Sequence, residues 1–257
     1  PRPNDMFERN TWTWDTYSSI SKKLQRKDDS GQYTRQMINW LDWTNILYEH
    51  NATVFDSTLK QARLDTPEAR KAFQVLQRLW AEDRVIGPGY LDGFASQRLV
   101  MVNEWTSFWR FDSITFDWDV APYPAGDRKA ALVGYGGYAI PFNSAHPQEA
   151  WLFLKFLLSE QAQLIFSKGS GDISAHKAVA TKLYSDDSWG PKHKWQAFVA
   201  PMMDYGVVSE SYLSPIWGKV EDIFWNTGAP LRNGTAPANT VAEQLNRQLQ
   251  AVLDAME

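Results

Sequence analysis

The chain has 257 residues, 44% of them hydrophobic and 22% charged, a balance typical of a globular protein with a sizeable core. Its net charge of −4 argues against nucleic-acid binding, which needs a basic face to meet phosphates. It has no cysteine, which excludes disulfides, thiol catalysis and cysteine metal sites, and no apolar run approaching the ~18–20 residues that cross a bilayer.

Two helices are predicted in the first third of the chain. One runs from Asp15 to Lys27, with Thr13 as its N-cap. The second begins at Thr66-Pro67-Glu68, an N-cap followed by Pro and an acidic residue in the first turn. Helical spacing then places these apolar residues on one face: Ala69, Ala72, Phe73, Leu76, Leu79 and Trp80.

The middle of the chain contains short candidate strands. Residues 99–103, 116–121 and 131–133 each favour a strand, and a fourth ends at Ile140 after the glycine-rich turn 134–137. Helices follow from Pro147, from Ser159-Glu160, and over 238–256. These strands are too few for a self-sufficient βαβ domain.

Thirteen tryptophans are the most unusual feature of the composition. An indole offers a large flat apolar surface and one N–H donor, which matches the apolar face and polar edge of a sugar ring. The same count also fits an aromatic core. The helix faces favour the core for Trp80, Trp151 and Trp225.

Several catalytic and cofactor motifs are missing from the sequence. The four histidines lack metal-ligand spacing, and there is no nucleophile elbow or P-loop. The spacing of Gly134, Gly136 and Ala139 is similar to that of a dinucleotide-binding fingerprint. That fingerprint requires a helix directly after the glycines, and Ile140-Pro141 follows here instead. No cofactor or metal is expected. Carboxylates are numerous, so their count does not exclude a pair of catalytic carboxylates of the kind that glycosidases use.

Motifs along nearly the whole chain resemble the extracellular solute-binding proteins of family 1, the maltose-binding-protein-like sugar-binding components of bacterial ABC importers. Gly137–Pro141, followed by the helix from Pro147, is the most specific match, and Ser174 departs from the family's usual Pro. The other matching stretches are Thr11–Asp15, Asp65–Leu79, Phe94–Trp105, Asp119–Pro124 and Gly171–Val179.

The resemblance implies an α/β fold of the two-lobed, type II periplasmic-binding-protein kind. The chain matches the C-terminal two-thirds of such a protein: a helix-rich C-terminal lobe plus part of the N-terminal lobe, most of which is absent. Residues 1–119 and 160–257 would form the C-terminal lobe, and 120–159 would return into the N-terminal lobe.

The resemblance also implies a ligand site between lobes. Trp217 matches a position where the family places a sugar-stacking aromatic. Glu104 and Asn103 are candidate hydroxyl partners. The remaining candidates are Trp43, Trp105 and Trp109 as aromatic platforms, and Gly136, Gly137 and Tyr138 as the N-lobe wall.

The implied function is that of a non-catalytic receptor, periplasmic or lipid-anchored at the cell surface. It would close two lobes on a sugar or oligosaccharide and deliver it to the membrane permease subunits of an ABC importer, as a monomer when full length. Two alternatives stay open: a receptor of the same fold for a non-sugar solute, and a carbohydrate-active enzyme with an aromatic cleft.

Overall fold

The computed structural model describes residues 2–106, 111 and 114–256. Its contacts divide the chain into two compact units. Unit 1 comprises Pro1–Asn103, Tyr123–Val133 and Tyr205–Glu257, and unit 2 comprises Glu104–Pro122 and Gly134–Asp204. These boundaries follow contacts within the chain. The assignment of 1–119, 120–159 and 160–257 to lobes is a separate question and stays a prediction.

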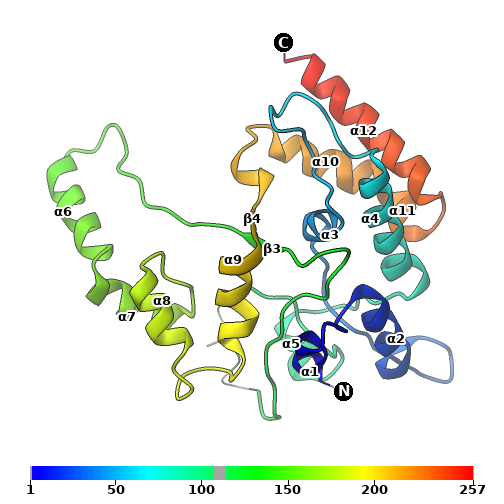
Figure 1. The fold of residues 1–257 in the computed structure, drawn as a ribbon, viewed down its shortest axis with the longest axis horizontal. Helices are drawn as coiled ribbons and strands as arrows, with labels where there is room; N and C mark the ends of the chain where they lie inside the picture. Colours follow the sequence, from blue (N-terminus) through cyan, green and yellow to red (C-terminus); the bar gives the residue numbers. More distant parts are fainter. Residues whose placement is uncertain (1, 107–110, 112–113, 257) are drawn as a thin grey trace. The chain divides into compact units, whose positions relative to one another are not determined.

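Unit 1 contains most of the secondary structure (Figure 1). Its helices are α1 (Pro3–Glu8), α2 (Trp14–Leu24), α3 (Trp43–Glu49), α4 (Pro67–Gln77), α5 (Leu91–Ala95), α10 (Trp217–Thr227), α11 (Ala229–Asn233) and α12 (Ala238–Asp254). Its strands are β1 (Arg26–Lys27), β2 (Tyr33–Arg35), β3 (Ala131–Val133) and β4 (Gly206–Val208).

Two small sheets connect distant segments of unit 1. Strands β1 and β2 form an antiparallel pair. Strands β3 and β4 pair in parallel, with Ala131 opposite Gly206 and Val133 opposite Val208. Parallel neighbours need a long crossover, and here the crossover contains all of residues 134–204, which belong to unit 2. Unit 2 is thus mainly an insertion between two paired strands of unit 1.

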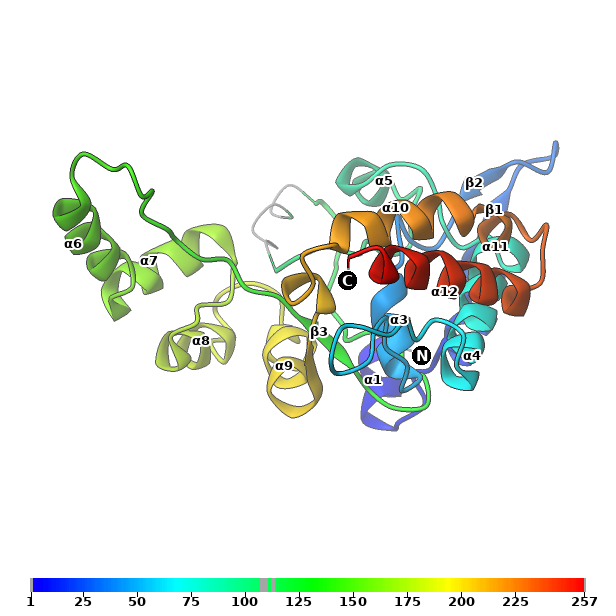
Figure 2. The same cartoon turned by 90° about the horizontal axis from the view of Figure 1, so that it is seen from above.

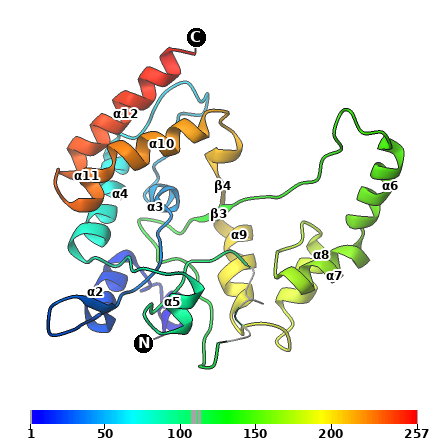
Figure 3. The same ribbon diagram turned by 180° about the vertical axis from the view of Figure 1, so that it is seen from behind.

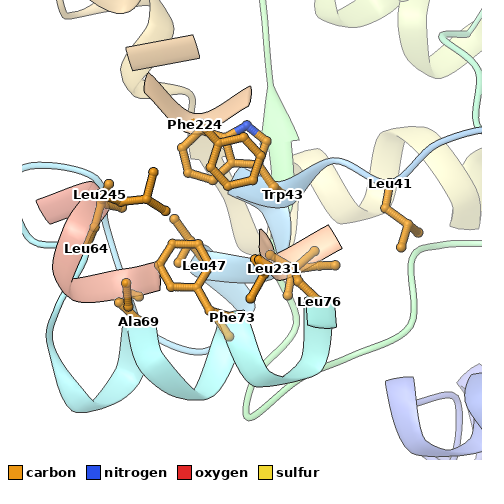
Figure 4. Packing of buried hydrophobic residues seen from close by; sticks show 14 of the residues in the cluster. Leu41, Trp43, Leu47, Leu64, Ala69, Phe73, Leu76, Phe224, Leu231 and Leu245 are labelled. Carbon is orange, nitrogen blue, oxygen red and sulfur yellow. The ribbon is translucent and has the colours of Figure 1, made fainter. Parts of the chain in front are cut away.

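The core of unit 1 lies among α3, α4, α10, α11 and α12, which lie side by side in Figures 1 and 3. Figure 4 shows the overlapping rings of Trp43 and Phe224 in the same cluster as Leu76, Leu231 and Leu245. Burying an aliphatic or phenyl side chain of this size contributes about 1.5–3 kcal/mol. This cluster therefore holds in place the N-terminal ends of α3 and α10, where Trp43 and Trp217 lie.

Helix α4 confirms its predicted start. The Thr66 side chain accepts a hydrogen bond from the Ala69 N–H at 3.2 Å, and Pro67 occupies the first turn. Ala69, Phe73 and Leu76 are fully buried, as their spacing predicts. Helix α2 is likewise capped by Thr13 but ends at Leu24, because Gln25 turns to an extended conformation and the next two residues form β1.

We expect Thr66→Ala to lower the free energy of unfolding by about 1 kcal/mol, because it removes the side-chain acceptor from the first turn of α4. Urea titration followed by circular dichroism measures the loss. Thr66→Ser keeps the hydroxyl and is the matched control, expected to stay close to the parent. Equal losses in the two variants would contradict a capping role.

Three of the four predicted strands were wrong. Leu99 makes only an isolated parallel bridge to Gln36, and residues 116–121 and 138–140, all of them described, form no strand. The alternation of residue types was present, but a strand also needs a hydrogen-bonding neighbour. Residues 131–133 form a strand because β4 lies beside them.

Unit 2 consists mainly of α6 (Pro147–Leu157), α7 (Glu160–Ser170), α8 (Lys177–Tyr184) and α9 (Ala200–Tyr205), which Figure 2 shows from above. The predicted starts of α6 and α7 are confirmed. Helix α6 contains no buried residue, so the core assignment of Trp151, whose side chain is 53% exposed, was wrong. None of the helices in the described ranges is both long and apolar enough to cross a membrane.

Candidate functional site

An aromatic stack joins the starts of α3 and α10 in unit 1. The Trp43 ring lies 3.9 Å from the Phe224 ring and 6.2 Å from the Trp217 ring, and is within 8° of parallel to both. Trp43 is only 3% exposed, whereas Trp217 is half-buried. Trp217 is therefore the member of the stack that presents surface to solvent, and Trp43 supports it.

Asp42 fixes the helix that carries Trp43. Its Oδ1 accepts hydrogen bonds from the Thr44 N–H at 3.0 Å, the Asn45 N–H at 3.1 Å and the Thr44 hydroxyl at 2.7 Å. Burial raises the pKa of Asp42, and these three donors oppose the rise. An aspartate at the helix N-cap satisfies amides that the helix leaves without partners. The cap sets the position of Trp43, the first residue of α3.

Asn103 lies in a second polar cluster of unit 1. Its carbonyl oxygen accepts from Trp40 Nε1 at 3.1 Å and from Asn39 Nδ2 at 3.2 Å, and its N–H donates to Asn39 Oδ1 at 2.7 Å. These bonds occupy the main chain of Asn103 and fix its position. The Tyr123 hydroxyl lies beside the Asn103 side chain.

Electrostatics link the Asn103 cluster to the Asp42 cap. Burial raises the pKa of Tyr123, and the negative charges of Asp42 and Glu49 raise it further. Asp42 also raises the pKa of Glu221 on α10. The two clusters thus belong to one acidic, aromatic-rich part of unit 1, which we call the indole–carboxylate site: Asp42, Trp43, Asn103, Tyr123, Trp217 and Glu221.

Glu221 and Asp42 were missed from the sequence. Glu221 follows Trp217 by four residues and precedes Trp225 by four, the spacing that brings side chains together on a helix. Its Oε2 accepts the Trp225 Nε1–H at 2.7 Å. Trp225 was expected in the core, but its side chain is 45% exposed. The Arg232 guanidinium lies over the Trp225 ring, 4.8 Å from the ring centroid, and makes a cation–π contact with it.

A buried carboxyl lies behind α3. Glu49 is 0% exposed and accepts hydrogen bonds from Trp14 Nε1 and, at 2.8 Å, from Asn45 Nδ2. Burial raises the pKa of Glu49 well above its ordinary value, against the effect of both donors. Trp14, unassigned from the sequence, is therefore a core residue with a structural partner.

This raised pKa predicts a pH-dependent stability. A carboxyl with a higher pKa in the folded than in the unfolded chain gives its full stabilisation below the unfolded value and loses it as the pH rises through the folded value. We expect the urea midpoint to fall between pH 5 and pH 8, and to fall less in Glu49→Gln. Glu243→Gln, an exposed carboxylate on α12, is the control. An identical fall in Glu49→Gln and the parent would contradict the prediction.

The other predicted site residues belong to unit 2. Trp105 is 67% exposed, and its N–H donates to Glu104 Oε1 at 2.9 Å. Tyr138 is also exposed, and a Cβ added to Gly136 or Gly137 would meet no atom within 4 Å. Trp109 lies outside the described residues. The roles of all nine predicted residues in solute binding stay predictions.

The described part of the chain contains no group of three or more His, Asp or Glu side chains arranged to hold a metal ion. Burial raises the pKa of both Asp42 and Glu221, and the negative charge of Asp42 raises that of Glu221 further. The groups present at the indole–carboxylate site include flat indole surface and carboxylates that accept hydrogen bonds.

Solved structures of binding proteins share this fold. An ABC substrate-binding protein from Listeria monocytogenes in complex with cycloalternan superposes with a TM-score of 0.75 at 17% identity, over 97% of this chain and 68% of that one. The maltose/maltodextrin-binding domain from Bdellovibrio bacteriovorus bound to maltotriose gives 0.74 at 19% identity, over 95% and 67%. UgpB from Mycobacterium tuberculosis in complex with glycerophosphocholine gives 0.73 at 17% identity, over 95% and 64%.

These matches confirm the predicted fold class, that of the two-lobed binding proteins, and the chain spans about two-thirds of the length of each structure. None of the curated proteins matches the sequence. The model of the family described as "Bacterial extracellular solute-binding protein" matches residues 4–200, more than half of the chain. This chain belongs to the bacterial extracellular solute-binding proteins.

Proposed function

We propose that this protein is a non-catalytic receptor that binds a sugar or oligosaccharide and delivers it to an ABC importer. The observation that carries the proposal is the Trp217 indole, half-buried and backed by the parallel ring of Trp43. A flat rigid ring that keeps one solvent-facing side suits the C–H face of a pyranose. Asn103, in the same unit, is the proposed polar partner for a hydroxyl.

The similar structures support a carbohydrate as the solute. Two of them hold cycloalternan and maltotriose. We propose that Trp217 stacks on one sugar ring and that Asn103 meets its hydroxyls. Trp43 would act mainly by supporting Trp217, because so little of its surface is exposed.

The remaining candidate residues all lie in unit 2. We propose that Trp105 and Trp109 add aromatic platforms, that Glu104 accepts hydrogen bonds from hydroxyls, and that Gly136, Gly137 and Tyr138 form the N-lobe wall that the family resemblance implies. The high exposure of Trp105 supports this, because a large indole in water favours a partner. Hinge closure of two lobes would then bury the solute.

The transport role follows from the family. A receptor of this kind works outside the cytoplasmic membrane, in the periplasm or held at the cell surface by a lipid anchor. Its closed, loaded form would dock on the permease subunits of the importer as a monomer.

One similar structure favours a second candidate, a non-sugar solute. UgpB holds glycerophosphocholine, which carries a cationic and an anionic group. Calorimetric titration of the 257-residue chain with maltotriose, cyclic glucans and glycerophosphocholine decides between the two. We expect heat of binding with a carbohydrate; binding of glycerophosphocholine alone would overturn the sugar assignment.

A turnover assay tests the non-catalytic part of the proposal. We expect a fluorescently labelled oligosaccharide that binds to be recovered intact after prolonged incubation. Release of shortened labelled products, lost in Asp42→Asn or Glu221→Gln, would identify a carbohydrate-active enzyme instead, since these two carboxyls are the acids beside the stack.

A further inference from the structure

The Glu221 carboxylate of unit 1 lies among three tryptophans, one of which is hydrogen-bonded to it. Glu221 Oε2 accepts the Trp225 Nε1–H at 2.7 Å. The indoles of Trp217 and Trp43 lie near the same carboxylate and, like that of Trp225, lower its pKa. Trp217 and Trp225 approach it from one turn before and one turn after on α10, and Trp43 approaches from α3.

An ionised carboxylate is suited to this role. It is an acceptor only, with about four lone-pair positions on two oxygens, whereas an indole N–H is a donor only. No ion pair to Glu221 occurs within the described ranges, so indoles take the place that a cation would otherwise fill. A donor bond to a charged acceptor is stronger and more directional than one between neutral groups.

Stacking alone does not fix the orientation of the stacked rings. Parallel rings can turn in their own plane or swing about the broad second side-chain torsion of Trp while keeping contact. A hydrogen bond at the edge of the ring removes that freedom, because the N–H must point at its acceptor. With Trp43 held against Phe224 at 3.9 Å, a shared acceptor would align Trp217 with it.

We infer that Glu221 is the positioning residue of the aromatic platform: its carboxylate orients the rings of Trp43, Trp217 and Trp225 and turns their N–H edges away from the solute. The rings then offer the solute a flat apolar surface and donate no hydrogen bond to it. The role in solute affinity rests on the proposed function, whereas the orientation of the rings does not.

Several charged groups surround this carboxylate. Burial raises the pKa of Glu221, the Trp225 indole lowers it, and Asp42 in front of α3 raises it again. Arg232 on α11 lies over the far ring of the set, that of Trp225. Lys219 and Asp222, on α10 itself, are exposed.

Indole nitrogen–proton NMR spectra of the chain test the orientation without any solute. Between pH 4 and pH 8 we expect the signals of Trp43, Trp217 and Trp225, assigned through single Trp→Phe variants, to shift with one common midpoint. In Glu221→Gln that step should vanish, because the amide does not ionise. Glu243→Gln, the control, should keep it. A step that survives in Glu221→Gln, or three signals without a common midpoint, would overturn the inference.

Affinity provides the second measurement. We expect Glu221→Gln to weaken carbohydrate binding about fivefold, which is the effect of weakening roughly one hydrogen bond that orients the rings. Glu221→Asp keeps the negative charge, but its side chain is too short to meet the indoles. It replaces the glutamine variant in this measurement if that variant fails to fold. If no carbohydrate binds the parent chain, the proposed function fails, and the NMR titration still decides the role of Glu221.

Discussion

Trp217→Ala is expected to weaken carbohydrate binding by about 1–2 kcal/mol, which is roughly a five- to thirtyfold rise in Kd. The loss follows from geometry: Trp217 is the half-buried outer ring of a stack whose inner ring, Trp43, has almost no exposed surface. Without the outer indole, the sugar face loses its flat apolar partner. Isothermal titration with the carbohydrate that binds the parent chain measures the change.

Two control variants separate the platform from general damage. Trp217→Phe keeps a flat ring and should retain most of the affinity. Trp151→Ala removes an exposed indole on α6 of unit 2 and should leave the affinity close to that of the parent. Unfolding midpoints of all three variants show whether the fold is retained. Unchanged affinity in a folded Trp217→Ala variant would remove this residue from the site.

Local rules predicted the helices well because their signals are local. Thr13 and Thr66 cap helices by accepting a hydrogen bond from an N–H three residues later, and Pro67 lies in the first turn of α4. The spacing of apolar residues then predicts which face is buried. Strands were predicted poorly because pairing is decided far along the chain. Strand β3 pairs with a strand more than seventy positions later, and residues 116–121, all of them described, form no strand.

The site was predictable only in part, for a similar reason. Resemblance to a family pointed to Trp217, and composition pointed to tryptophan. Neither indicated that Trp43 would lie beneath Trp217, since the two positions are far apart in sequence and meet through the core. The i, i+4 spacing of Trp217, Glu221 and Trp225 was visible in the sequence, but a carboxylate on a helix is usually exposed to solvent. The partial burial of Glu221 depends on contacts between α3 and α10, which the sequence does not show.

Phe224→Ala is expected to lower the free energy of unfolding by about 3–5 kcal/mol, the usual loss for a phenyl ring in a core. Phe224 is 1% exposed, and its ring contacts those of Trp43, Phe73, Trp80 and Trp225. A cavity here borders three helices, so collapse of one neighbour into it would disturb the others. Urea unfolding followed by tryptophan fluorescence measures the change.

The matched control for this prediction is Phe142→Ala, which removes the same ring from a fully exposed position of unit 2 and should change stability by less than about 0.5 kcal/mol. Equal effects of the two substitutions would contradict the placement of Phe224 in the core. A folded Phe224→Ala variant should also bind carbohydrate more weakly, because Trp43 would lose the ring that fixes it, and Trp217 rests on Trp43. Stability and affinity should therefore fall together at Phe224, whereas at Trp217 affinity should fall more than stability.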